Sequence, residues 1–252
     1  MIKEGDTVYL KGKKDSFFVV VKKDEEFSTH KGTIKFNDII GKNYGDTVLT
    51  HKGEEFLLLK PTLYEIIMYG IKRHTQIIYP KDSAYITLKL GLTSGMKVLE
   101  SGIGSGGLTI VMANALNPDG RIHAYEKEEK FLKNALKNLQ LAKLDHIVVP
   151  HLQDLSQPIE EKDFDAAFID VREPWLYIEN VKKVLKKGAM IGFLVPTTNQ
   201  IVEVLRELKK LDFVDIEVEE ILQRQYKPVP DRLRPEDRMV AHTGYLIFAK
   251  NG

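Results

Sequence analysis

The stretch Val98–Gly107, which reads VLESGIGSGG, decides the fold of this chain. The apolar run Met96–Leu99 before its glycines predicts a buried strand, and Leu108–Leu116 after them predicts a helix. Four glycines lie between the two: Gly102, Gly104, Gly106 and Gly107. A strand that turns into a helix over such glycines leaves backbone N–H groups bare, with no Cβ to keep a ligand away. We therefore expect a doubly wound α/β fold that holds a nucleotide-like cofactor at this turn.

The glycine spacing alone fits two kinds of cofactor. It satisfies both the dinucleotide pattern G-x-G-x-x-G and the tighter pattern G-x-G-x-G. Glu100 favours one of them, because a carboxylate at the mouth of the loop would repel a pyrophosphate. S-adenosylmethionine has no phosphate and carries an ammonium and a sulfonium, both of which suit a nearby carboxylate. The loop therefore favours S-adenosylmethionine, and a nicotinamide cofactor beside a solvent-facing Glu100 is the alternative.

The composition excludes several classes of protein. The formal net charge is only +1, so a nucleic-acid partner would need a local basic patch. The chain has no cysteine, which excludes disulfides, and its seven histidines show no metal-ligand spacing, so we expect no metal. No apolar signal core opens the chain and no run reaches membrane-spanning length. We expect a cytoplasmic protein that makes no contact with a membrane.

Three regions follow from the pattern of elements along the 252 residues. Residues 1–62 hold short β segments between turn glycines, which predicts a small β-barrel-like domain. Residues 63–95 predict linking helices, over Leu63–Gly70 and Ser83–Leu90. Residues 96–252 alternate strands and helices, which predicts an S-adenosylmethionine-dependent domain with a parallel sheet and helices on both faces. One of these helices is expected over Pro174–Leu185.

The last two strands of the chain are expected to pair antiparallel at one edge of this sheet. They span Val214–Leu222 and Tyr245–Lys250, and a long polar loop joins them. The parallel strands are expected over Lys97–Ser101, Arg121–Glu126, Ile147–His151, Phe164–Asp170 and Ala189–Val195.

Four successive strands end on, or shortly before, an acidic residue: Glu100, Glu126, Asp154 and Asp170. Ligands of such sheets lie beyond the carboxyl ends of the strands. Glu126 is placed to accept both ribose hydroxyls of an adenosine cofactor, and Asp154 to accept from the adenine amine. For Asp154, a turn residue is the alternative. Asp170 has no evident duty toward the cofactor and faces the place of the methyl acceptor, so we interpret it as catalytic; the alternative is a helix cap or a turn residue.

Four segments resemble the tRNA (adenine-N1)-methyltransferase family that acts at position 58 of tRNA: Thr75–Asp82, Glu100–Gly106, Pro196–Gln200 and His242–Tyr245. The resemblance covers essentially the whole chain. The glycine loop is common to class I methyltransferases, whereas the other three segments are much more specific to the family. The resemblance implies a homotetramer, S-adenosyl-L-methionine as the methyl donor and the T-loop of tRNA as the substrate. Whether position 57 is also methylated stays open.

The resemblance also implies roles for single residues. Asp170 matches the family's catalytic Asp, and Tyr79 matches a tyrosine that lines the target-base pocket. The chain departs from the family two residues after Asp170, because Arg172 stands where a Pro is common, and Pro174 and Trp175 follow. The candidate cofactor-binding residues are Gln76, Glu100, Ser101, Gly102, Gly104, Ser105, Gly106, Gly107, Glu126, Asp154 and Asp170.

The proposed chemistry needs electrostatic stabilisation more than acid–base catalysis. N1 of adenine has a free lone pair, but methylation makes the ring cationic. A carboxylate at Asp170 that accepts from the N6 amine would stabilise this charge. Because the adenosine must leave its stack in the folded tRNA, Tyr79 is expected to stack on the extruded base or to bind its edge.

A basic, proline-rich stretch, Arg224–Pro235, is the candidate surface for tRNA phosphates. An exposed hairpin connection is the alternative. Trp175 is a candidate pocket wall, with ordinary core packing as its alternative, and His242 is expected to be structural. The candidate phosphate-binding residues are Arg224, Lys227, Arg232 and Arg234.

Two other functions compete with this interpretation. One is another class I methyltransferase, such as a protein L-isoaspartate methyltransferase; the N-terminal β domain and the segment His242–Tyr245 argue against it. The other is an RNA-binding subunit without catalysis. The intact glycine loop, together with Glu126 and Asp170, argues against that function.

Overall fold

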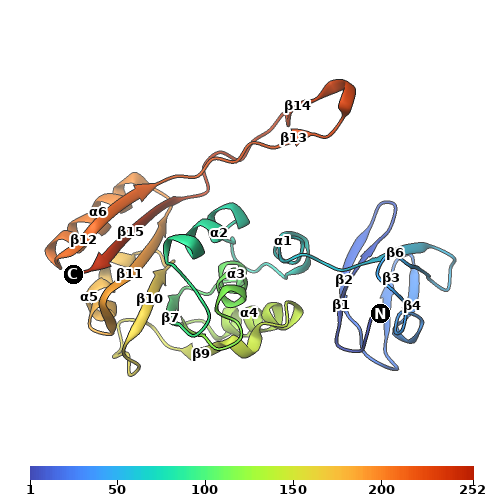
Figure 1. Ribbon diagram of the computed structural model, residues 1–252, viewed down its shortest axis with the longest axis horizontal. Coiled ribbons are helices and arrows are strands. Elements are labelled where there is room, and N and C mark those ends of the chain that lie inside the picture. The colour runs from blue at the N-terminus through green and yellow to red at the C-terminus, as the bar shows by residue number, and fades with distance from the viewer.

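A seven-stranded sheet forms the centre of the larger domain in the computed structural model, which describes residues 1–252 (Figure 1). Its strands lie in the order β12-β15-β11-β10-β7-β8-β9. The five strands from β11 to β9 are parallel, whereas β15 is antiparallel to both β11 and β12. The predicted sheet, with its antiparallel pair at one edge, is confirmed. The bounds are β7 Lys97–Ser101, β8 Arg121–Glu126, β9 Val148–Leu152, β10 Phe164–Ile169, β11 Leu185–Val195, β12 Phe213–Glu219 and β15 Tyr245–Asn251.

Helices cover both faces of this sheet. One face packs against α2 (Pro80–Lys89), α3 (Gly107–Leu116) and α4 (Glu129–Leu141), and the other against α5 (Ile178–Lys182) and α6 (Thr198–Lys210). Alternate residues of one strand therefore enter different cores, as Val98 and Leu99 of β7 do. Burial on both faces fixes the strands and, with them, the carboxyl ends at which ligands bind.

The helix predicted over Pro174–Leu185 is confirmed only over Ile178–Lys182. A 3₁₀ turn, η4 (Pro174–Leu176), is followed by the short helix α5, and β11 already begins at Leu185. Leu185 pairs with Phe164 of β10 and is buried in the core below α5 and α6. Sheet pairing and burial therefore override the helical pattern at this end of the segment.

The N-terminal region is an antiparallel β structure with a core of its own. Four strands form one sheet in the order β2-β1-β6-β5, and β3 and β4 form a separate hairpin. The strand β3 is mostly polar and partly exposed. The bounds are β1 Thr7–Lys11, β2 Ser16–Val20, β3 Glu26–Thr29, β4 Gly32–Lys35, η1 Phe36–Asp38, β5 Thr47–Leu49 and β6 Glu55–Leu59.

A short linking segment joins this region to the larger domain. It consists of α1 (Leu63–Glu65) and the π-helical turn η2 (Ile66–Gly70), and it begins with a capping box between Thr62 and Glu65. The N-terminal region also contacts the end of α4, where the hydroxyl of Thr7 donates to the carbonyl of Leu141 at 2.7 Å.

A two-stranded arm leaves the sheet between β12 and β15 and projects far from it (Figure 1). Near its tip β13 (Tyr226–Lys227) pairs antiparallel with β14 (Arg234–Pro235), and η5 (Pro230–Arg232) makes the turn. The remaining element, the 3₁₀ turn η3, spans Asp145–Ile147. None of the helices combines the length and the apolar character that crossing a lipid bilayer requires.

Candidate cofactor and substrate site

The loop between β7 and α3 depends on glycines in left-handed conformations. These are Gly102, Gly104 and Gly106, with φ of 85°, 52° and 80°. At Gly102 a Cβ would lie 1.9 Å from the carbonyl oxygen of Asp170, so no other residue fits. The amide of Gly102 donates to the carbonyl of Tyr125 at 3.1 Å, and the amide of Asp170 donates to that of Ser101 at 2.9 Å. The loop is thus bound to the carboxyl ends of three strands.

The hydroxyl of Ser105 fastens the segment before α2 onto this loop. It accepts from the amides of His74 and Thr75 at 3.0 and 3.1 Å, and Asn138 donates to the Ser105 carbonyl at 2.9 Å. The hydroxyl and the carbonyl of Ser105 are therefore used within the protein. Ser105 thus holds the segment that carries Gln76, and its contact with a cofactor stays a prediction.

A pocket of about 460 Å³ opens at the carboxyl ends of β7 to β10, and its size suits a small cofactor. The predicted residues that line this cofactor pocket are Gln76, Ser101, Gly102, Gly104, Glu126, Asp154 and Asp170. Sequence reasoning missed Phe131 and Tyr177, which also line it. Three other predicted residues, Glu100, Ser105 and Gly107, do not line this pocket but line the inner cavity beside it. Gly106 lines neither space and starts α3 in a left-handed conformation.

Glu100 lies beneath the glycine loop and not at its mouth. Its side chain is only 2 % exposed, so the solvent-facing alternative is wrong. One carboxylate oxygen, Oε1, accepts from the hydroxyl of Thr109 at 2.9 Å, whereas the buried Oε2 has no partner. Burial raises the pKa of Glu100 to about 8. The hydrogen bond from Thr109 opposes this rise, and the nearby carboxylates of Asp170 and Glu126 add to it. An unpartnered buried oxygen of this kind is a place for a cationic donor.

Asp170 follows β10 and lines both the cofactor pocket and the inner cavity. Although its side chain opens on these spaces, burial by the surrounding protein raises its pKa to about 7. The nearest following turn, η4, is preceded by Glu173 and has no side-chain cap. The alternative of Asp170 as a helix cap is therefore wrong.

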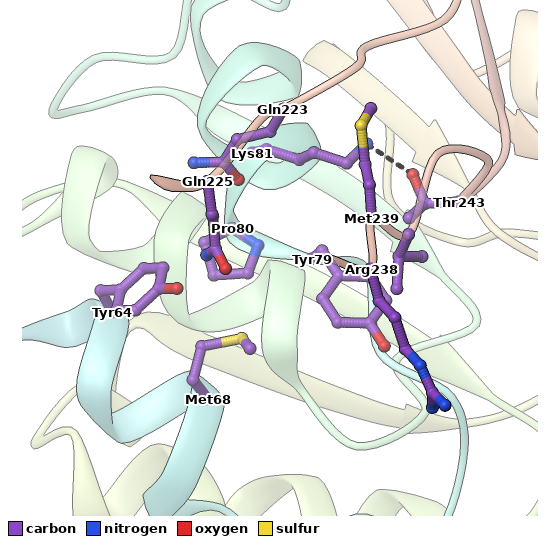
Figure 2. A pocket seen from close by; sticks show the side chains of 11 residues that line it. Tyr64, Met68, Tyr79, Pro80, Lys81, Gln223, Gln225, Arg238, Met239 and Thr243 are labelled. Carbon is purple, nitrogen blue, oxygen red and sulfur yellow. Dashed lines mark hydrogen bonds between the residues drawn. The ribbon is translucent and has the colours of Figure 1, made fainter. Parts of the chain in front are cut away.

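A second pocket lies between α1 and η2, the start of α2 and the base of the arm (Figure 2). Tyr79 stands in it, with Arg238 of the arm beside its ring (Figure 2). The side-chain amide of Gln76 donates to the phenol oxygen of Tyr79 at 3.2 Å. Gln76 thus connects the cofactor pocket to the tyrosine pocket. Sequence reasoning missed Arg238, because no motif marks it.

A buried charge pair fixes the arm at its base. Asp82 is 0 % exposed, and the ammonium of Lys81 lies 2.9 and 3.0 Å from its two oxygens. Lys81 also donates to the carbonyl of Ile221 at 2.7 Å and to the hydroxyl of Thr243 at 2.6 Å. The outgoing and the returning segment of the arm are therefore both bound to the first turn of α2.

His242 adds a second fastening at the same end of the arm. Its Nδ1 lies 2.7 Å from Oε1 of Glu220, and its Nε2 lies 2.9 Å from the carbonyl of Pro196. The Glu220 carboxylate, followed by the Pro196 carbonyl, raises the pKa of His242 above its usual value. These contacts give His242 a structural role.

The four basic candidates lie on the arm, but the structure does not leave all of them free. Lys227 pairs with Asp237, and Nη1 of Arg234 lies 3.5 Å from the same carboxylate. Arg224 contacts the sulfur of Met239 at 3.4 Å. Arg232 is exposed at the tip.

Trp175 lies in neither pocket, which corrects its expected place as a pocket wall. It is partly buried in η4 and packs against the core below α5 and α6. The 3₁₀ turn directs it onto the sheet, and Tyr177, two residues later, lines the cofactor pocket instead.

The sheet order, the glycine turn and the carboxylates at the strand ends define a class I methyltransferase. The chain belongs to the family described as the tRNA methyltransferase complex GCD14 subunit, whose model matches residues 56–234. Residues 1–48 match the TrmI-like N-terminal family.

Named relatives cover nearly the whole chain. The tRNA (adenine(57)-N(1)/adenine(58)-N(1))-methyltransferase TrmI of Methanocaldococcus jannaschii is 31% identical over 92% of this chain and 90% of its own. The crystal structure of the tRNA (m1A58) methyltransferase TrmI from Aquifex aeolicus is 42% identical, with a TM-score of 0.80 and coverage of 99% and 98%. A structure described as a SAM-dependent O-methyltransferase from Thermotoga maritima is 44% identical, with a TM-score of 0.87 and coverage of 99% and 94%.

Proposed function

We propose that this chain is a tRNA (adenine-N1)-methyltransferase that transfers the methyl group of S-adenosyl-L-methionine to N1 of adenosine 58 in the T-loop. The observation that carries the proposal is the pair of pockets connected by Gln76. One pocket is lined by carboxylates and glycine backbone, and the other by Tyr79 and apolar side chains. Asp170 lines the first pocket together with Gln76, whose amide contacts Tyr79 of the second, so a cofactor and an extruded base in these pockets would be neighbours.

The residues of the cofactor pocket fit S-adenosylmethionine. The orphaned Oε2 of Glu100 suits the ammonium of the methionine part, and Glu126 suits the ribose hydroxyls. Asp154 lines the same pocket, although its Oδ1 also accepts from the amide of Ser156 at 2.8 Å, as a turn residue does. When bound, the cofactor supplies an electrophilic methyl group.

The target base is proposed to bind between Tyr79 and Asp170. Tyr79 offers an aromatic face for stacking, and its hydroxyl is oriented by Gln76. An ionised Asp170 accepts from the N6 amine and stabilises the positive charge that methylation places on the ring. Because the lone pair on N1 is already free, the protein has to align the base more than to remove a proton.

The remaining substrate contacts are proposed to come from the arm. Its exposed basic residues suit tRNA phosphates, and its exposed apolar side chains, such as Leu222 and Val240, support the homotetramer that the resemblance implies. Arg238 extends the basic surface into the tyrosine pocket. We also propose a cytoplasmic location, which a tRNA substrate supports.

Methylation of an unmodified tRNA transcript with labelled cofactor, followed by nucleoside analysis, tests the proposal. We expect N1-methyladenosine from the intact transcript, and its loss when adenosine 58 is replaced by guanosine. Residual product would locate activity at position 57, for which the Methanocaldococcus relative is also named. A catechol acceptor in a parallel reaction tests O-methylation, which the name of the Thermotoga structure suggests. The proposal would be overturned if the catechol were methylated and no labelled methyl group entered the tRNA.

A further inference from the structure

Three polar side chains converge at the β8–β9 edge of the sheet, outside both pockets. They are His123 on β8, His151 on β9 and Glu161 in the segment that leads to β10. Nδ1 of His123 lies 3.0 Å from Nε2 of His151, and Oε1 of Glu161 lies 3.8 and 3.6 Å from these two nitrogens. The side chains are 13, 18 and 27% exposed, so they are sheltered but reachable from solvent.

The three atoms form a triangle of the size that a metal ion requires. Edges of 3.0, 3.6 and 3.8 Å leave one point about 2.0 Å from every corner, which matches Zn–N and Zn–O bonds of about 2.0–2.2 Å. The Glu161 oxygen is too far from either nitrogen for a hydrogen bond. Hydrogen bonding therefore does not explain why this oxygen faces the two imidazoles.

Neighbouring aromatic groups hold the three side chains in place. The hydroxyl of Tyr125 donates to the other oxygen of Glu161 at 2.6 Å, and its ring stacks on His151 with a centroid distance of 4.4 Å. The ring of His123 packs edge-on against Phe164 at 5.4 Å. Support of this kind orients ligands before an ion arrives.

We propose that His123, His151 and Glu161 bind a divalent transition-metal ion of the Zn²⁺ type, with solvent water completing the coordination. Two imidazoles and one carboxylate are a donor set that such ions prefer. One ammonium lies near, that of Lys97, and it is held over the Phe164 ring by a 2.9 Å bond to the carbonyl of Lys162. With the ion bound, two neutral imidazoles and one carboxylate leave a modest local charge of +1 in a partly solvated place.

The spacing of the histidines along the sequence does not indicate this site, because its ligands come from adjacent strands. Tyr125 of β8 lies directly opposite His151 of β9, and His123 is two residues before Tyr125. Residues two apart share a face of a strand, so the two histidines are diagonal neighbours on one face. Nothing in the linear sequence shows this register.

The proposed ion has a structural role. It ties together β8, β9 and the segment after β9, whose residues Asp154 and Leu155 line the cofactor pocket. The carbonyl of Tyr125 on β8 also accepts a hydrogen bond from the amide of Gly102 in the glycine loop. Metal binding should therefore stabilise one wall of the cofactor pocket without taking part in methyl transfer.

Titration of metal-free full-length protein with Zn²⁺, and with Co²⁺ as a spectroscopic probe, tests this site. We expect one equivalent of Co²⁺ to give the visible bands of a site with imidazole ligands, and Zn²⁺ to displace it and to raise Tm. The H123A and H151A variants should lose both effects. Y125F should retain the ligands but bind about 10–100-fold more weakly, because it removes the support of Glu161.

The matched control is H146A, which removes an exposed histidine bonded to Asn117 in the same domain. It should bind the metal as the unmodified protein does. Circular dichroism establishes that each variant is folded. Absence of stoichiometric binding, or binding that survives in folded H123A and H151A, would overturn the proposal. Because the readouts are Co²⁺ spectra and Tm, the result does not depend on tRNA methylation.

Discussion

The hydroxyl of Thr243 donates to Oδ2 of Asp82 at 2.7 Å, although the two residues are 161 positions apart. They belong to two of the segments that resemble the tRNA methyltransferase family, and the structure shows that these segments form one joint. Lys81 completes the joint by binding both residues. The arm is thus fixed where it leaves the sheet, whereas its tip projects away from the domain.

Loosening this joint should weaken tRNA binding and spare the cofactor. T243V removes a donor from a buried carboxylate, which should cost about 1–3 kcal/mol of stability. We expect a higher Kd for tRNA and an unchanged Kd for S-adenosylmethionine, measured by filter binding and calorimetry. T198V, which changes another threonine outside the joint, is the control. Equal losses for both ligands would show that the joint supports the whole domain and not the arm.

Asp170 should matter for the rate and not for cofactor affinity. D170A should bind the cofactor nearly as well as the unmodified protein, because Glu126 and the glycine loop remain. Its rate of methyl transfer should fall about a hundredfold or more, the scale of losing one preorganised electrostatic partner. D170N keeps the shape without the charge and should also be impaired. Single-turnover methylation at saturating tRNA separates these steps, and a normal rate in D170A would end the catalytic assignment.

Cofactor binding should release protons near neutral pH. In the free protein, burial raises the pKa of Glu100 to about 8 and that of Asp170 to about 7, so at pH 7 Glu100 is mostly protonated and Asp170 is protonated in about half of the molecules. A bound cation favours their ionised forms and lowers both pKa values. Calorimetry in two buffers of different ionisation enthalpy should show this release, and E100Q should reduce it. Proton uptake would contradict the assignment of Glu100 to the ammonium.

The same two groups make the free protein less stable as pH rises. Their folded-state pKa values are raised above the unfolded ones, so their contribution is fully present below about pH 4 and is lost as pH rises through about 7–8. We expect the Tm of the free protein to fall across this window, and the fall to be smaller for E100Q. A Tm profile that E100Q leaves unchanged would show that folding does not raise the pKa of Glu100.

Glu126 should contribute to cofactor affinity directly. E126A should weaken binding of S-adenosylmethionine by about 1–3 kcal/mol, because two ribose hydroxyls lose their acceptor. NAD should bind neither protein, and calorimetry measures both ligands. E129A is a nearby control, because Glu129 pairs with Lys133 on the surface and does not line the cofactor pocket. Tight NAD binding would contradict the choice of cofactor.

The arm should make tRNA binding sensitive to salt despite the small net charge. Replacing Arg224 and Arg232 with alanine should flatten the slope of log affinity against log salt by about one to two units. Asp237 neutralises part of the arm through Lys227 and Arg234, so D237N should strengthen binding. The control pair is Lys133 and Lys183, which bind Glu129 and Glu179 in the larger domain and are not part of the arm. An unchanged slope in the arm variant would move the tRNA site elsewhere.

The sequence predicts the sheet well because its strands are apolar runs that stop at polar residues. β7 and β8 have the predicted bounds, and so does the acidic edge that they form. Local patterns fail where distant contacts decide. The burial of Glu100 depends on Thr109 of a packed helix, and the place of Trp175 depends on a 3₁₀ turn. The cluster at His123 depends on strand register, which no local signal carries.

Helix α4 spans the distance between the cofactor pocket and the N-terminal region. Phe131, in its first turn, lines the cofactor pocket, and Leu141, its last residue, accepts the hydrogen bond of Thr7. Gly70 packs between Phe18 and Leu141 so closely that a Cβ there would lie 3.1 and 3.2 Å from them. Thirteen residues make a rod of about 20 Å, stiff along its axis. One stiff element therefore joins the N-terminal region to the wall of the cofactor pocket.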